Sequence, residues 1–337
     1  MRAADESRPV CYATLESMRR RAQRVAVLSL SFAAGIVALG AAAQRAPASS
    51  PVVISSGTNA TRTTIPVTID GQRATCVLDT GTSAMIVSPW LAQAAHLATR
   101  AGTFEVAPDG HTYVDKQTEI ARFGVASYAL HDLPALISPN VTGSNALCGY
   151  DFFMHFPTLI DRDRRQVTLF PSPSKLTRLH CITVDLTPHV PLATIEINDT
   201  WLSDIVLDSG MAGGGALWDG IRSELRRPLV ANANYETMPA AVRQGLACGA
   251  SASVRYTPGS SSSLMPICTE PQRPDGYNGI VETNLPTVHA MAVDYAHRRV
   301  CFDAGYADVA MPAAPAPATT PWRDAWSRYN YLRPPKS

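Results

Sequence analysis

The sequence predicts an all-β protein built from two similar lobes, and three observations lead to that prediction. The chain of 337 residues contains 26 prolines and 21 glycines, which interrupt it frequently, and few stretches have helical periodicity. Short runs such as residues 65–69 and 192–197 alternate apolar and polar positions, the pattern of a half-buried strand. One set of motifs also occurs twice in the same order, which indicates an internal duplication.

The first repeated motif is a hairpin that ends in an acidic triplet. The run at residues 74–78 leads into Asp79-Thr80-Gly81, and the run at residues 203–207 leads into Asp208-Ser209-Gly210. One of the alternating strands lies shortly upstream of each run. We therefore expect each hairpin to deliver one aspartate to a tight turn.

Two further motifs follow each triplet. The strand Leu147-Cys148-Gly149 corresponds to Ile280-Val281-Glu282, and the third positions lie 70 and 74 residues after the respective aspartates. Twelve residues later the copies match again at Asp161 and Asp294, which we interpret as strand-start or turn residues. Three motifs in one order, twice, support the duplication.

These motifs resemble those of the aspartic peptidases, in which each lobe or subunit supplies one Asp-Thr/Ser-Gly turn and one apolar-apolar-Gly strand that crosses beneath it. Over residues 65–302 the chain resembles a fused, bilobal, single-chain form of bacterial type with short retropepsin-like lobes. The resemblance implies two β-barrel lobes related by a pseudo-twofold axis, with a cleft between them. We expect the N-terminal lobe in residues 44–176, the C-terminal lobe in 177–310 and a Pro-rich tail in 311–337.

The expected chemistry is peptide hydrolysis by two aspartates. Two carboxylates a few ångströms apart do not both ionise cheaply, so one keeps a proton while the other acts as a base. Asp79 and Asp208 are therefore the candidate catalytic dyad, and neither a metal nor an organic cofactor is needed. The resemblance implies that five neighbours support the dyad, either by hydrogen bonds or by lacking a side chain: Thr80, Gly81, Thr82, Ser209 and Gly210.

A flap that closes over substrate is also expected between the first triplet and its crossing strand. Residues 106–113 contain a Pro-Asp-Gly turn signal about thirty residues past Asp79. Asp109, Gly110 and Tyr113 are the candidate substrate-binding residues of this hairpin. The alternative is an ordinary surface hairpin with a packing tyrosine.

The second copy departs from the family pattern at two places. Glu282 replaces the glycine of the crossing strand, and a buried carboxylate is costly unless it is solvated or hydrogen-bonded. Glu282 either disturbs the dyad, adds a third carboxylate, or sits differently because Gly279 supplies the close approach. The run Met211-Ala212-Gly213-Gly214-Gly215 replaces the polar start of the first loop and is interpreted as a roomy or flexible binding loop.

The N-terminal region has the pattern of a signal peptide. An apolar stretch at residues 25–43 follows four arginines within residues 19–24 and ends in three alanines, which predicts cleavage before Gln44. An uncleaved N-terminal anchor is the alternative, since about 19 apolar residues can just span a bilayer. Translation starts at Met1 or at Met18. Either outcome places the body in the periplasm or outside the cell.

Six cysteines follow this leader, an even number that fits an exported domain. They allow 15 connectivities, and free buried thiols are the alternative. The positions of Cys248 and Cys268, both in the second half of the chain, favour a bond between them. The family topology implies a second bond between Cys76 and Cys148, which would leave Cys181 with Cys301.

The charge balance and the remaining motifs limit the partners. The formal net charge is +1 for the full chain, which offers no electrostatic footprint for nucleic acid. The chain lacks the Gly-x-Ser-x-Gly elbow of serine hydrolases. We expect an aspartic endopeptidase that acts on a polypeptide, contacts a membrane only through an uncleaved leader, and is complete as a monomer. The alternative is a non-catalytic binding or inhibitor protein that retains the fold.

Overall fold

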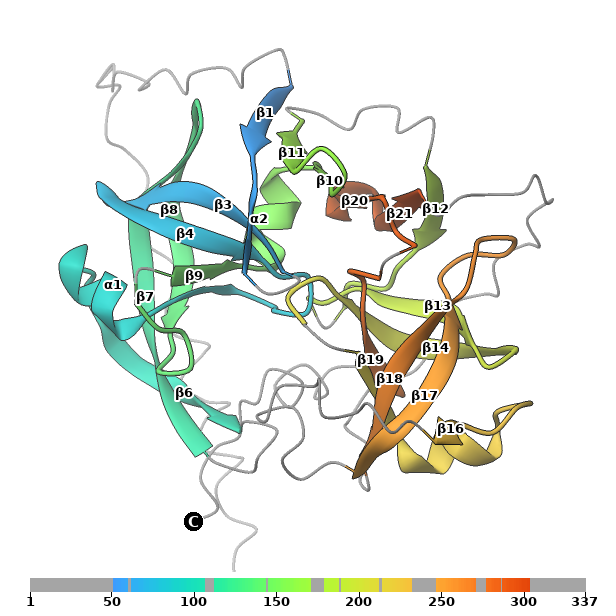
Figure 1. Ribbon diagram of the computed structural model, residues 1–337. Coiled ribbons are helices and arrows are strands. Elements are labelled where there is room, and N and C mark those ends of the chain that lie inside the picture. The colour runs from blue at the N-terminus through green and yellow to red at the C-terminus, as the bar shows by residue number, and fades with distance from the viewer. Residues whose placement is uncertain are drawn as a thin grey trace, which may run out of the picture. The chain divides into compact units, whose positions relative to one another are not determined.

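The computed structural model describes residues 51–59, 62–106, 112–143, 145–170, 179–187, 189–211, 214–231, 247–270, 277–285 and 287–303. These residues belong to the unit that begins at Ala46. Nearly all of the regular structure is β-strand, arranged as two closed barrels and one further sheet (Figure 1). The predicted all-β bilobal fold is confirmed.

The N-terminal barrel is a ring of six strands in the order β3-β4-β9-β5-β8-β7, closed by pairing between β7 and β3. Strands β2 and β6 extend the sheet at its ends. The strands are β2 (Gly57–Asn59), β3 (Arg62–Ile69), β4 (Gln72–Leu78), β5 (Met85–Val87), β6 (Arg100–Val106), β7 (Thr112–Val125), β8 (Tyr128–Ile137) and β9 (Asn145–Cys148), with helices α1 (Pro89–Ala94) and α2 (Tyr150–His155).

The C-terminal barrel repeats this ring position for position, as β13-β14-β19-β15-β18-β17 closed by pairing between β17 and β13. The identical order of corresponding strands is the structural form of the internal duplication. The elements are β13 (Leu192–Ile197), β14 (Thr200–Asp208), β15 (Gly215–Trp218), the 3-10 helix η1 (Asp219–Ser223), β16 (Val230–Ala231), β17 (Ala247–Arg255), β18 (Ser263–Glu270) and β19 (Gly279–Glu282).

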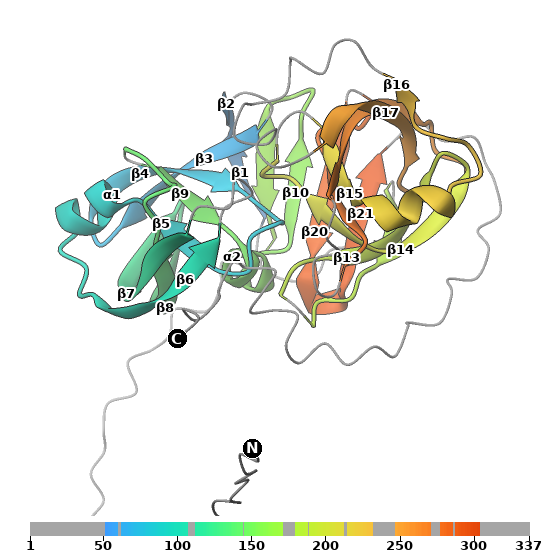
Figure 2. The same cartoon turned by 90° about the horizontal axis from the view of Figure 1, so that it is seen from below.

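The third sheet joins the two copies through the antiparallel pair β10 and β20, and Figure 2 shows β10 between the strands of the two barrels. Its order is β1-β11-β10-β20-β21-β12. Leu159 pairs with Ala292, its own equivalent in the other copy, so the pseudo-twofold axis passes through this pair. The elements are β1 (Val52–Ser55), β10 (Thr158–Asp161), β11 (Gln166–Leu169), β12 (His180–Thr183), β20 (Ala290–Asp294), η3 (Tyr295–His297) and β21 (Arg299–Asp303).

Short-range sequence chemistry explains the hairpins that precede the triplets. Asp70 and Gly71 connect β3 to β4 with φ values of 45° and 86°, and Asn198 and Asp199 connect β13 to β14 with 47° and 62°. Two consecutive positive φ values define the type I′ turn, whose twist suits a two-residue hairpin and whose residues are usually Asn, Asp or Gly. These turns set the register that carries each strand forward to its aspartate.

The matched residues Asp161 and Asp294 each cap a turn in the third sheet. The Asp161 carboxylate accepts the Arg164 N–H at 2.9 Å, and Asp294 accepts the N–H of His297 at 3.3 Å. The next residue in each turn, Arg165 or Arg298, is left-handed. Such equivalent geometry supports a structural role for both carboxylates.

Two disulfides agree with the expected pairings, one implied by the family topology and one left over from the other two. Cys76 bonds Cys148 between the neighbouring strands β4 and β9, and Cys181 bonds Cys301 between β12 and β21. Cys268 is also disulfide-bonded, and Cys248 is opposite it in the β17–β18 register. The Cys248 side chain lies outside the described residues, so that third pairing stays a prediction. The two bonds indicate an oxidising compartment.

The predicted leader in residues 1–43 and the tail in 311–337 lie outside the described residues. In the described ranges, the helices are too short and too polar to cross a bilayer.

Candidate active site

The two triplets lie at equivalent ends of the hairpin strands. β4 runs parallel to β9, with Leu78 opposite Cys148, and β14 runs parallel to β19, with Asp208 opposite Glu282. The crossing strand therefore supports each triplet from the side. Asp79 follows β4 directly and Asp208 is the last residue of β14, so both aspartates leave their barrels at the same point of the ring.

The structure brings the two carboxyl groups together at the glycines of the triplets. A Cβ atom built on Gly81 would lie 2.4 Å from Cγ of Asp208, and one built on Gly210 would lie 2.0 Å from Cγ of Asp79. Each glycine thus makes room for the opposite aspartate. The two carboxyl groups are close enough for each to change the pKa of the other.

Reciprocal hydrogen bonds between Thr80 and Ser209 tie the triplets together. The Thr80 hydroxyl donates to the carbonyl of Leu207 at 2.7 Å and accepts the N–H of Ser209 at 2.9 Å. The Ser209 hydroxyl donates to the carbonyl of Leu78 at 2.8 Å and accepts the N–H of Thr80 at 3.1 Å. Both side chains are buried, where satisfied hydrogen bonds hold geometry most firmly.

The electrostatics of the pair favour a shared proton. Burial raises the pKa of Asp79 well above its usual value, and the negative charge of Asp208 raises it further. Burial likewise raises the pKa of Asp208, opposed by hydrogen bonds from the backbone of Gly210 and from Asp79. Two carboxyls in this relation release their protons as a pair, so a singly ionised dyad is the natural state of the site.

The backbone around the two aspartates differs between the lobes. The Asp208 Oδ1 atom accepts N–H groups from Gly210 at 2.6 Å and from Met211 at 3.0 Å. Thr82, the counterpart of Met211, donates its N–H to the carbonyl of Asp79 at 3.4 Å and accepts the N–H of Tyr150 at 3.0 Å. Within the described residues, the Thr82 hydroxyl makes no hydrogen bond to Asp79, and the contact of Thr82 with Asp79 is made by the backbone.

The crossing strand of the first lobe requires glycine. A Cβ on Gly149 would lie 2.3 Å from the carbonyl oxygen of Ala84 and 2.5 Å from that of Thr82. In the second lobe the loop is opened by Gly214, which has φ +131° and occupies the position of Ala84. The backbone at Gly214 therefore accommodates the larger residue at position 282.

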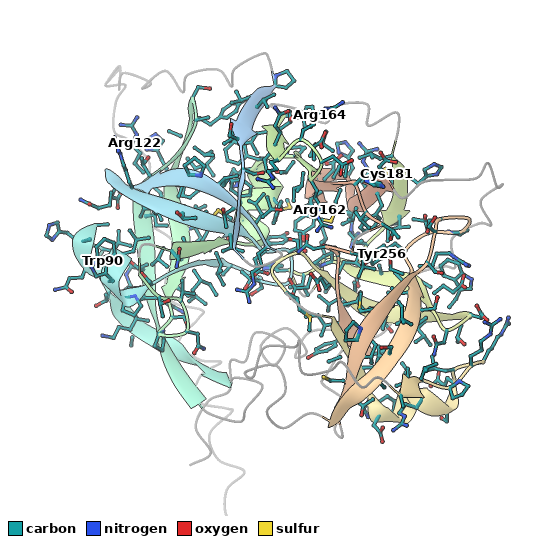
Figure 3. All side chains as sticks on the ribbon, in the orientation of Figure 1. Trp90, Arg122, Arg162, Arg164, Cys181 and Tyr256 are labelled. Carbon is teal, nitrogen blue, oxygen red and sulfur yellow. A yellow bond between two sulfur atoms is a disulfide. The ribbon has the colours of Figure 1, made fainter. Side chains whose placement is uncertain are left out.

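Glu282 is buried and held by this loop. Its Oε2 atom accepts the N–H of Gly214 at 2.9 Å, and its backbone N–H donates to the Gly214 carbonyl at 2.9 Å. The hydroxyl of Tyr256 donates to the Glu282 carbonyl, and the carboxylate interacts electrostatically with Arg162. The side chains of Tyr256 and Arg162 are labelled in Figure 3. Gly279 also supplies a close approach, because its Cβ would lie 2.6 Å from the Ala216 carbonyl oxygen.

This arrangement predicts the effect of changing Glu282. We expect Glu282→Ala to lower the free energy of unfolding by about 1–3 kcal/mol, because the buried N–H of Gly214 would lose its acceptor. Glu282→Gln keeps an acceptor oxygen and serves as the matched control with a smaller loss. Urea unfolding followed by tryptophan fluorescence measures both, and an unchanged midpoint for Glu282→Ala would contradict the role of this hydrogen bond.

A hairpin occupies the place of the expected flap. β6 and β7 pair antiparallel with Val106 opposite Thr112 and Glu105 opposite Tyr113. Asp109 and Gly110 lie outside the described residues, as does the side chain of Tyr113. Substrate binding by these three residues stays a prediction.

Sequence reasoning missed three residues at the site. Asn284 donates its amide to the carbonyl of Ser209 at 2.9 Å, and the hydroxyl of Tyr295 donates to the carbonyl of Thr80 at 3.4 Å. Arg62 is near enough for its charge to act on both aspartates. Asn284 and Tyr295 fall within the repeated motifs, but their counterparts in the first copy are Asp151 and Arg162, so the repeat itself gave no signal. Among the described residues, no group of three His, Cys, Asp or Glu side chains converges as a metal site would.

Residues 65–155 match the family model described as gag-polyprotein putative aspartyl protease. The match contains the first triplet, Asp79-Thr80-Gly81, and its crossing strand with Gly149. No curated protein matches the chain. Together with the two closed barrels, the family match confirms the resemblance to aspartic peptidases and supports an aspartyl-protease type of function.

Proposed function

We propose that the protein is an aspartic endopeptidase, a hydrolase of peptide bonds, with Asp79 and Asp208 as its catalytic dyad. The observation that carries the proposal is the close approach of the two carboxyl groups, each against the glycine of the opposite triplet. The reciprocal bonds of Thr80 and Ser209 hold this geometry. Preorganised groups of this kind need little rearrangement when charge develops in the transition state.

In the proposed mechanism the singly ionised dyad performs acid and base catalysis together. The ionised carboxylate takes a proton from a water molecule placed between the two groups, and that water attacks the scissile carbonyl carbon. The protonated carboxyl gives its proton to the carbonyl oxygen, so that a neutral diol forms. As the C–N bond breaks, the carboxyl that took the water proton passes it to the leaving nitrogen. The other carboxyl takes a proton from the diol, which restores the singly ionised dyad. The chemistry needs no cofactor.

The proposed substrate is an extended polypeptide, bound as a strand against the β6–β7 hairpin. One chain carries both aspartates, so a monomer suffices for activity. We place the protein in the periplasm or outside the cell, since its disulfides suit an oxidising compartment and residues 25–43 resemble a signal peptide. Its partners include no nucleic acid, and a membrane only if the leader stays attached.

The proposal is tested with the full chain and an unfolded polypeptide substrate. Intact-mass spectrometry after incubation between acidic and neutral pH should reveal new fragments, and pepstatin should suppress them. The same spectra report on cleavage of the protein's own flanks, near residues 44–51 and 311–321, in case it processes only itself. Absence of any fragment from either source would contradict the proposal.

A non-catalytic binding or inhibitor protein is the second candidate, favoured by the replacement of the crossing-strand glycine by Glu282. Glu282 is buried and accepts the N–H of Gly214, and this accommodation weakens the alternative. Tight binding of a polypeptide without turnover would support it.

A further inference from the structure

A cationic side chain lies at the same end of the β3–β4 hairpin as the first aspartate of the site. The antiparallel pairing of β3 and β4 extends to Thr64 opposite Val77, and Arg62 and Asp79 each lie two residues beyond that pair. Arg62 is near enough for its charge to act on the Asp79 carboxyl.

One nitrogen of the Arg62 guanidinium, Nε, is buried without a hydrogen-bond partner among the described residues. The residue as a whole is half-buried. Burying part of a charged group without a partner is costly. A cation kept there at such a cost points to an electrostatic role.

The second lobe has no equivalent of this charge. In the β13–β14 register Leu192 is opposite Val206, and the residues two positions beyond that pair are Asp208 and Val190, which is fully buried. The two copies therefore differ at this position, where the first has the cation Arg62 and the second has the apolar Val190. The attraction of Arg62 lowers the pKa of both Asp79 and Asp208 and opposes the effect of burial.

We propose that Arg62 is a positioning residue that holds the dyad in the singly ionised form and so extends the working range of the site to more acidic pH. The proposal rests on the proposed peptidase function. Without the cation, the dyad would take up its second proton more readily, and the base that activates water would be lost as the pH falls.

The other groups that face the dyad do not supply this charge. Burial raises the pKa of Tyr295 well above its usual value, so its hydroxyl stays neutral beside Thr80. The backbone N–H groups of Gly210 and Met211 contact Asp208 alone. Among the described residues, Arg62 is the cation that acts on both carboxyls.

The first test compares kcat/KM as a function of pH for the wild type, Arg62→Met and Arg62→Lys. Arg73→Met is the matched control, because Arg73 is exposed on the same hairpin. We expect the acidic limb of the Arg62→Met profile to move to higher pH. At a pH on the acidic limb of the wild-type profile, kcat/KM of Arg62→Met, expressed relative to the variant's own plateau, should then be lower than that of the wild type on the order of tenfold. Arg62→Lys and Arg73→Met should follow the wild type. A profile lowered equally at every pH would overturn the proposal.

The second test does not depend on turnover. NMR titration of 13C-labelled aspartate carboxyls, assigned with Asp79→Asn and Asp208→Asn, should show the dyad signals titrating at higher pH in Arg62→Met than in the wild type. Unchanged titration overturns the role of Arg62 whatever the activity. A shifted titration in a protein that hydrolyses no peptide upholds that role while the peptidase function fails. Arg62→Gln replaces Arg62→Met if the latter does not fold.

Discussion

Replacing Asp79 by Asn should lower kcat/KM for peptide hydrolysis by about 10²–10⁴-fold, the range that acid–base groups contribute. The amide has the shape of the carboxyl group but has no acidic proton to transfer. Asp208 therefore loses the partner with which it shares the acid and base steps of the reaction. Asp208→Asn should have a similar effect. The double variant should lose little more, because residues that act as a unit are not additive.

The control for this prediction is Asp163→Asn. The side chain of Asp163 is 67% exposed and contacts only the ring of His289 in the described structure, so its replacement should leave kcat/KM within error of the wild type. Substrate cleavage is followed by the appearance of new amino termini, and circular dichroism verifies the fold of each variant. Turnover by Asp79→Asn at the wild-type rate would remove Asp79 from the mechanism.

Gly210→Ala is expected to have the second largest effect, although it changes no functional group. Its new Cβ would lie 2.0 Å from Cγ and 2.2 Å from Oδ2 of Asp79, so the carboxyl must move. A displacement of about 1 Å at a catalytic group costs on the order of 100-fold in rate. Gly81→Ala should act in the same way on Asp208, where the Cβ would lie 2.4 Å from Cγ.

Gly71→Ala separates this local effect from the general cost of replacing glycine. Gly71 has φ +86° and no atom within 4 Å of an added Cβ, so the change should cost about 1 kcal/mol of stability through backbone strain. Its kcat/KM should remain that of the wild type. Equal losses of activity in Gly71→Ala and Gly210→Ala would show that the close packing of the triplets is not what matters.

The short-range features of the fold could be predicted from the sequence because they depend on neighbouring residues. Turn chemistry at Asp70-Gly71 and Asn198-Asp199 specifies the two hairpins, and alternation specifies which strand residues face the core. In β3, for example, Ile65, Val67 and Ile69 are buried while the residues between them are exposed. The repeated order of motifs then placed both aspartates at equivalent ends of strands.

The effect of Glu282 could not be predicted from the repeat. Because Glu282 is the counterpart of Gly149, its burial was expected to be costly. The sequence left three consequences open: a disturbed dyad, a third carboxylate, or a different placement of the side chain. The accommodation of Glu282 depends on the backbone of Gly214, 68 residues earlier in the chain. Gly214 and Glu282 thus compensate for one another. This relation can be recognised only when the pairing of β15 with β19 is known.

By itself, the sequence determined that this protein has two copies of an Asp-containing hairpin and which residues end each one, because those properties follow from local turn and strand preferences. Tertiary structure decided which groups meet at the ends of the hairpins. The hydroxyls of Thr80 and Ser209 reach across 127 and 131 residues of chain to carbonyl groups of the opposite lobe, and the charge of Arg62 acts on the carboxyl groups of both lobes. Contacts of this kind depend on barrel closure and on the pseudo-twofold sheet, which no local pattern encodes.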